Sequence, residues 1–184
     1  MASPAMRGLL VGRFQPFHNG HLAAVRAIRA ARPDEVLLLA VGSAEDSHTP
    51  LNPFTAGERL EMIERTLETE QVVGVRAYPI PDIHRHALWV AHVVSLLPRF
   101  DRVYANNPLT RVLFEQAHVP VEVPSLVERE RYSGVAIRER VVRGDSIVDA
   151  VPRAVYDFLQ QIDGLERIRL LSATGPSITP EHLR

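Results

Sequence analysis

Residues 8–21 of this chain read GLLVGRFQPFHNGH, a short apolar run followed by a polar turn and the start of a helical pattern. The run Leu9-Leu10-Val11 predicts a buried strand, and the periodicity that follows predicts a helix. His18 and His21 therefore lie at a strand-to-helix turn. Such a turn presents backbone N–H groups and the positive end of a helix, which both favour an anion. With Arg13 as a further donor, the simplest ligand for this turn is a polyphosphate.

Outward from this stretch, apolar runs and helical patterns alternate along the chain. The run EVLLLAV at 35–41 is almost continuously apolar, as expected of a strand buried on both faces. Repeated strand–helix units imply an α/β fold, with a Rossmann-like parallel sheet that carries helices on both faces. Further strands are predicted at 8–11, 72–78, 101–105 and 119–123, and helices at 20–31, from 55, at 87–97, from 108 to about 117, at 133–143 and from 152 to about 162.

The composition is that of one globular domain. The 184 residues are 46% apolar and 23% charged, and a chain of this length can bury a core. We expect a single nucleotide-binding domain over 1–184, with its core at about 7–171 and a flexible tail at 172–184, where Ser, Thr, Gly and Pro prevail.

Charge and hydropathy limit the kinds of partner that the chain is expected to have. A net charge of −1 gives no indication of a nucleic-acid or anionic-membrane partner. No apolar run approaches the ~20 residues of a membrane span, and the N-terminus lacks the apolar centre of a signal peptide. We therefore expect a cytoplasmic protein with no nucleic-acid and no membrane partner.

Two residue types are absent from the sequence. Without cysteine there are no disulfides, thiolate nucleophiles or cysteine metal sites. Without lysine, all 21 basic residues are arginine, which excludes a Schiff-base lysine and a Walker-type phosphate loop. Phosphate binding must then rely on arginine, histidine, backbone and metal, and the planar fork of arginine suits phosphate well.

Four polar loops follow the predicted strands, at 13–21, 42–54, 79–86 and 105–108. In open parallel sheets, ligands bind beyond the carboxyl ends of the strands. Because these ends meet at one edge of the sheet, we expect the four loops to form one site.

The turn GRFQPFHNGH resembles the first signature of the nucleotidylyltransferase superfamily, whose (H/T)xGH motif is related to the HIGH motif of class I aminoacyl-tRNA synthetases. The similarity is closer to the archaeal-type nicotinamide-nucleotide adenylyltransferases. It continues through GSAEDSHTPLNPFTAGERLEMI, PIPDIHRHALWV, FDRVYANNPLTRVLFEQ and RYSGVAIRERVVRGD, and so spans about residues 7–171.

The resemblance implies adenylyl transfer from ATP to nicotinamide mononucleotide, which gives NAD and pyrophosphate. The 5′-phosphate would attack the α-phosphorus in line, and Mg²⁺ would be bound mainly through the ATP phosphates, with no protein metal ligand. Since the nucleophile is already an anion, positioning and charge stabilisation carry the catalysis. The resemblance also implies a homo-oligomer, with the hexamer as a frequent form.

The same resemblance assigns roles to individual residues. His18, His21, Arg13 and Arg138 would be catalytic, by contacting the phosphates and stabilising charge on the leaving pyrophosphate. The residues that would bind the substrates are Gly12, Phe14, Gln15, Gly20, Gly42, Ser43, His48, Asp82, Trp89, Asn107, Ser133, Gly134 and Ile137.

A second family signature, of the form SxTxxR, reads Ser133-Gly134-Val135-Ala136-Ile137-Arg138 here. It would hold the β- and γ-phosphates at a helix start. Val135 and Ala136 depart from the usual Thr and Glu. The missing hydroxyl removes one hydrogen bond to a charged group, worth roughly 1.5–3 kcal/mol, which predicts weaker but not abolished ATP binding.

Several residues have two readings that the sequence leaves open. Trp89 either stacks on the positively charged nicotinamide ring or packs in the core. Asp82 either recognises the carboxamide or ribose or simply forms a turn, and Asn107 either helps to bind the nucleotide or forms a turn. His84 and His86 suggest a metal pair, but no third ligand is apparent, and solvated loop histidines are the simpler reading.

Two alternative functions also stay open. The chain could be another nucleotidylyltransferase, with pantetheine phosphate, FMN or a polyol phosphate as acceptor. It could also be a non-catalytic nucleotide-binding regulator that keeps the pocket and has lost turnover, given the departures at Val135 and Ala136.

Overall fold

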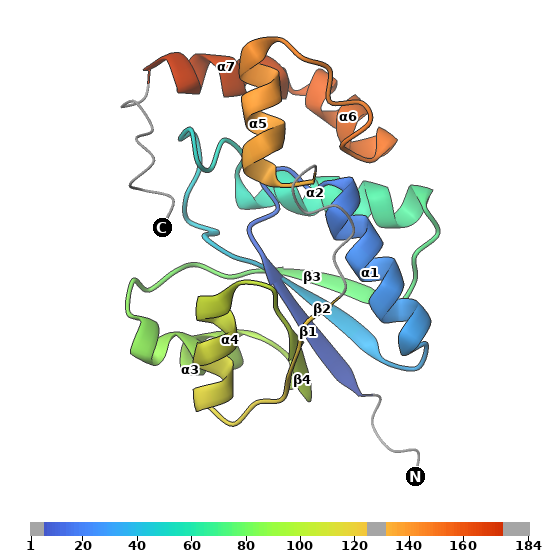
Figure 1. Cartoon of the computed structure of the whole chain (residues 1–184), viewed down its shortest axis with the longest axis vertical. Coiled ribbons are helices and arrows are strands. Elements are labelled where there is room, and N and C mark those ends of the chain that lie inside the picture. Colours follow the sequence, from blue (N-terminus) through green and yellow to red (C-terminus); the bar gives the residue numbers. More distant parts are fainter. Residues whose placement is uncertain (1–5, 125–131, 175–184) are drawn as a thin grey trace.

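In the computed structural model, which describes residues 6–124 and 132–174, the strands of the described chain form one parallel five-stranded sheet. Its order is β3-β2-β1-β4-β5, so β1 lies in the centre and the chain order reverses between β1 and β4 (Figure 1). Leu9 of β1 pairs with Leu38 of β2 and with Val103 of β4. The strands are β1 (Arg7–Gly12), β2 (Val36–Val41), β3 (Val75–Pro79), β4 (Arg102–Tyr104) and β5 (Val121–Glu122).

Helices cover both faces of the sheet (Figure 1). One face carries α1 (Asn19–Ala31), α2 (Ala56–Thr69), α5 (Gly134–Arg143), α6 (Arg153–Gln161) and α7 (Gly164–Thr174), and the other carries α3 (His86–Leu96) and α4 (Pro108–Gln116). The predicted single-domain, Rossmann-like α/β fold is thus confirmed. None of the described helices has the length and apolar character needed to cross a membrane.

The core explains why β2 is so apolar. Leu37, Leu39 and Val41 belong to one buried cluster, whereas Leu38 and Ala40 belong to a second cluster on the opposite face. Successive strand residues point to opposite faces, so both faces of this strand are buried.

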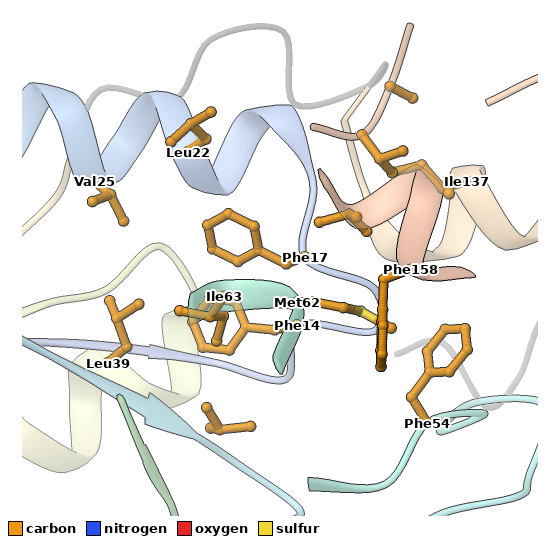
Figure 2. Packing of buried hydrophobic residues seen from close by; sticks show 14 of the residues in the cluster. Phe14, Phe17, Leu22, Val25, Leu39, Phe54, Met62, Ile63, Ile137 and Phe158 are labelled. Atoms are coloured by element: carbon orange, nitrogen blue, oxygen red, sulfur yellow. The ribbon is translucent and has the colours of Figure 1, made fainter. Parts of the chain in front are cut away.

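The polar turn after β1 is anchored in this core. Phe14 and Phe17 are almost completely buried and pack in the same cluster as Met62 of α2 and Phe158 of α6 (Figure 2). The two aromatic rings fix the backbone of the turn, so that the polar residues between and after them are held in place.

The structure differs from the sequence-based expectations at two places. Strand β3 begins at Val75 rather than at 72, because Gln71 and Gly74 both have positive φ and turn the chain first. Helix α7 was not predicted, and it runs through Thr174, three residues into the expected tail. The remainder of that tail, 175–184, lies outside the described residues.

Candidate active site

A cleft with two lobes lies at the carboxyl ends of the central strands, where ligands of open parallel sheets bind. Both lobes are lined by Val11, His21 and Asn107, so they adjoin. The smaller lobe has a volume of about 210 Å³ and is further lined by Leu10, Phe14, His18, Gly20, Ala24, Asn106, Tyr132, Ser133 and Gly134. The larger lobe has about 510 Å³ and is further lined by Gly12, Arg13, Gly42, Ser43, Asp82, His84, Arg85, His86, Trp89, Leu109, Thr110 and Leu113.

His18 and His21 cap the amino end of α1 with reciprocal hydrogen bonds. Nδ1 of His18 accepts a hydrogen bond from the backbone N–H of His21, and Nδ1 of His21 accepts one from the backbone N–H of His18, both at 3.3 Å. This is a capping box built from two imidazoles. Because each Nδ1 is an acceptor, each neutral ring carries its proton on Nε2. Both rings therefore offer an Nε2–H donor to a ligand.

Both imidazoles are held neutral by their surroundings. The two rings stack with centroids 3.5 Å apart, and Phe14 lies edge-on to His21 at 4.7 Å. Burial lowers the pKa of His18 to about 4, although its backbone hydrogen bond opposes the shift. Burial, and next the charge of His18, hold the pKa of His21 well below its usual value. At neutral pH the pair thus donates hydrogen bonds without carrying charge.

Positive charge at the cleft comes from two arginines instead. Arg13 lines the larger lobe, and its guanidinium forms no hydrogen bond or ion pair with any described residue. Arg138 of α5 is 7% exposed and donates from Nη1 to the carbonyl oxygen of Gln15 at 2.7 Å. Burial, followed by the charge of Arg13, lowers the pKa of Arg138 to about 10. The guanidinium of Arg13 is thus available to an anion in the larger lobe, whereas that of Arg138, cationic at neutral pH, lies behind Gly134 and lines neither lobe.

The amino end of α5 faces the smaller lobe. Ser133 caps this helix, since its Oγ accepts from the backbone N–H of Ala136 at 3.1 Å. Gly134 lies so close to the turn after β1 that an added Cβ would be 2.9 Å from the carbonyl oxygen of Gln15. Two helix ends, those of α1 and α5, therefore direct free N–H groups at this lobe.

Asp82 organises one wall of the larger lobe. Its Oδ1 accepts from Nε1 of Trp89 at 3.1 Å, and its Oδ2 accepts from Oγ of Ser43 at 2.9 Å. The indole also packs edge-on against Phe114, with ring centroids 5.7 Å apart. Trp89 thus packs partly against the core, as one of its two readings expects, and it also lines the larger lobe, where stacking on the nicotinamide ring stays a prediction.

Three predicted binding residues do not line the described lobes. Gln15 uses its side-chain amide to hold the backbone of Phe54, with bonds of 2.9 and 3.0 Å. Ile137 is fully buried in the core. His48 is exposed, and its Nδ1 bonds to Oγ of Ser47 at 2.9 Å. The other predicted residues, apart from Arg138 behind Gly134, all line one lobe or both.

Strained backbone marks the same edge of the sheet. Phe14, Ser43 and His84 have φ of 52°, 48° and 51°, and they follow β1, β2 and β3 respectively. Non-glycine residues rarely adopt this conformation, and such residues cluster at functional sites. His84 and His86 line the larger lobe, but within 6–124 and 132–174 no three metal-ligating side chains come together.

Sequence reasoning missed Arg59 of α2, which is fully buried. Its guanidinium donates to the backbone carbonyl oxygens of Arg13, Gly42 and Ser43, at 2.9, 2.7 and 3.0 Å, and its Nε donates to that of Thr55 at 3.2 Å. The only signal was its position four residues after the capping Thr55, which says nothing about contacts across the sheet.

Comparison with known proteins decides the family. The model of the cytidylyltransferase-like family matches residues 9–140. The chain belongs to this family. A nicotinamide-nucleotide adenylyltransferase from Thermoplasma volcanium is 46% identical over 172 residues, which cover 94% of this chain and 96% of the relative. One from Halorubrum lacusprofundi is 47% identical over 174 residues, with 95% and 97% covered. Within the cytidylyltransferase-like family the chain therefore groups with the archaeal nicotinamide-nucleotide adenylyltransferases.

A solved structure also shares the fold. A bifunctional NMN adenylyltransferase/ADP-ribose pyrophosphatase from Francisella tularensis, complexed with AMP and a manganese ion, aligns with a TM-score of 0.67 at 20% identity. The alignment covers 92% of this chain and 52% of that one. The cytidylyltransferase-like fold thus accounts for nearly all of this chain and for about half of the Francisella protein.

Proposed function

We propose that the chain transfers the adenylyl group of ATP to nicotinamide mononucleotide and so makes NAD and pyrophosphate. One observation carries the proposal: neutral Nε2–H donors and two helix ends adjoin the place where the two lobes meet, with Arg13 on the larger lobe and Arg138 directly behind Gly134. A reaction between two nucleotides needs one lobe for each nucleotide and an anion-binding point where the two lobes meet. The relatives are named nicotinamide-nucleotide adenylyltransferases, which supports an adenylyl donor and nicotinamide mononucleotide as the two nucleotides.

The two lobes suit different substrates. The smaller lobe adjoins the starts of α1 and α5, whose N–H groups suit the triphosphate of ATP. The larger lobe contains the indole of Trp89, whose flat face favours a positively charged pyridinium ring. In this assignment the α-phosphorus and the attacking 5′-phosphate meet beside His21, which lines both lobes.

The chemical step is a displacement at phosphorus. An oxygen of the mononucleotide 5′-phosphate forms a bond to the α-phosphorus, and the bond from that phosphorus to the bridging oxygen breaks, so pyrophosphate leaves with the electron pair. His18 and His21 donate Nε2–H bonds to oxygens on which charge grows, and Arg13 and Arg138 neutralise that charge. No proton is removed from the nucleophile, in keeping with histidines whose low pKa makes them poor bases.

A divalent cation would bind at this site through the polyphosphate rather than through protein side chains. The described residues hold no cluster of three metal-ligating side chains, so the ligands of the ion would be phosphate oxygens and water. The Francisella structure holds AMP with manganese, and we propose Mg²⁺ for this chain. When bound, the ion neutralises charge on the β- and γ-phosphates.

The face made by α3 and α4 supports self-association. These adjoining helices expose Leu88, Val94, Leu96, Leu109 and Val112, each 46–52% accessible. Exposed apolar side chains of this kind mark an interaction surface, since none of the described helices could cross a membrane. We propose that a second copy covers it in a homo-oligomer, for which light scattering of the purified chain should give a mass above 20.6 kDa.

A turnover assay tests the proposed function and its rivals. The chain is incubated with ATP, Mg²⁺ and one acceptor at a time: nicotinamide mononucleotide, pantetheine phosphate, FMN or a polyol phosphate. We expect NAD and equimolar pyrophosphate from the first acceptor alone. Product from another acceptor would favour the related transferases, and tight NAD binding by calorimetry without turnover would favour a regulator.

A further inference from the structure

We infer that Arg59 is a positioning residue that joins the turns after β1 and β2 and thereby sets the shape of the mononucleotide lobe. The inference rests on the proposed function for its choice of substrates. Three of the four carbonyl groups that Arg59 binds belong to Arg13, Gly42 and Ser43. All three residues line the larger lobe, and none of them lines the smaller one.

The bonds of Arg59 are unlike those of an ordinary structural arginine. Arg59 is 0% exposed, yet it forms no ion pair within the described part of the chain, and every one of its hydrogen bonds goes to a backbone carbonyl. Burial lowers the pKa of its guanidinium, opposed by the charges of Asp46 and Glu45. Burying a cation without a paired carboxylate costs free energy, so the position of Arg59 is explained by the backbone carbonyl groups that its N–H donors hold.

The planar fork explains why arginine occupies this position. The carbonyl groups of Arg13 and Gly42 share Nη1, while that of Ser43 takes Nη2, so one rigid group spans the ends of two neighbouring strands. A lysine ammonium at the end of its flexible stem cannot fix the same three oxygens in one plane. The backbone at Ser43 has positive φ, and a strained turn persists only when its surroundings hold it.

The consequences reach the side chains that face the substrate. Arg13 points its free guanidinium at the lobe, and Ser43 donates to Asp82, which in turn holds the indole of Trp89. Movement of the two turns would therefore displace both the phosphate-binding and the ring-binding parts of this lobe. The smaller lobe keeps its own supports, the His18–His21 cap and the bond from Arg138 to Gln15.

The experiment compares Arg59→Lys and Arg59→Met with a matched control, Arg167→Met. Arg167 is also largely buried, with 21% of its side chain exposed, and it donates to both carboxylate oxygens of Glu58 at 2.8 Å. It lines neither lobe. For each protein we measure kcat, the KM for each substrate and the melting temperature. The fluorescence of Trp89, the sole tryptophan, reports mononucleotide binding without any turnover.

Both Arg59 variants should raise the KM for nicotinamide mononucleotide about tenfold or more, with less than about a threefold change in the KM for ATP. The fluorescence titration should show the same loss of affinity, so this readout stands even if the proposed reaction fails. Arg59→Lys should be the milder change, because it keeps the charge. Arg167→Met should lower the melting temperature and leave both KM values unchanged.

Three results would overturn the inference. Equal rises in the two KM values would mean a general disturbance of the cleft rather than of one lobe. A lower melting temperature with unchanged KM values would leave Arg59 with a purely structural role. Failure of both Arg59 variants to fold would likewise assign the residue to stability alone.

Discussion

The low pKa of His18 predicts that stability depends on pH in a defined window. In the folded protein this pKa is about 4, whereas the ordinary value is 6.5. Between these values the unfolded chain binds more protons than the native one, so the free energy of unfolding falls as the pH falls from 6.5 towards 4. Above pH 6.5 the imidazole is neutral in both states, and its contribution to the pH dependence vanishes.

The magnitude follows from the shift. At 1.36 kcal/mol for each pKa unit, His18 alone should cost about 2 kcal/mol at pH 5 relative to pH 8, and about 3 kcal/mol near pH 4. With only 6% of its surface exposed, screening by solvent reduces this little. His21 has its pKa shifted in the same direction and adds to the effect.

Urea unfolding of the wild type and His18→Asn at several pH values isolates this contribution. Asparagine is among the best N-cap residues, so the variant keeps an acceptor for the N–H of His21 and loses only the titration. Apart from His21, whose pKa the charge of His18 lowers, the other titrating groups are common to both proteins and cancel in the difference. The stability of the wild type should therefore fall by about 2 kcal/mol more than that of the variant between pH 8 and pH 5. Parallel curves over this range would refute a buried, neutral His18.

Three further predictions concern the cleft. His21→Ala should lower kcat about 10²–10³-fold, the usual loss when one donor to a developing oxyanion is removed, while unfolding stays cooperative; wild-type turnover would contradict its role. Asp82→Asn should weaken the support of Trp89 and raise the KM for nicotinamide mononucleotide several-fold with the KM for ATP unchanged, so equal KM changes would count against the assigned lobes. Gly134→Ala should destabilise the fold by about 1–3 kcal/mol in urea and raise the KM for ATP, because its Cβ would be 2.9 Å from the oxygen of Gln15; a neutral result would show that the turn yields easily.

Local patterns in the sequence were enough to predict most of the helices and strands and the edge of the sheet at which the site lies. The apolar runs at 35–41 and 8–11 predict buried strands, and both form there. The topology of a parallel sheet then brings the loops after the first four strands to one edge, where residues of all four loops line the two lobes. These predictions succeed because they depend on periodicity and strand direction alone.

What the sequence did not reveal depends on contacts between distant segments. Nothing near Gln15 indicates that its amide would hold the backbone of Phe54, since any polar residue in a polar turn has the same local pattern. Arg59 sits among charged neighbours on an amphipathic helix and appears solvated in the sequence, yet it is fully buried. Helix α7 escaped prediction because Asp163, with φ of 53°, turns the chain directly before Gly164, and glycine is a poor sign of a helix start.

The arginines around the first turn explain how a chain with a net charge of −1 can attract a polyphosphate. Arg13, Arg59 and Arg138 lie near one another. Burial lowers the pKa of Arg59 and that of Arg138, and the charge of Arg13 lowers both further. Within the described residues none of the three is paired with a carboxylate; two bind backbone carbonyl groups and the third is free. Carbonyl groups satisfy the N–H donors without neutralising the charge, so the field of three cations persists in the cleft. Burial opposes protonation of His18 and His21, and the charge of His18 further opposes that of His21, so both are neutral donors beside fixed positive charge.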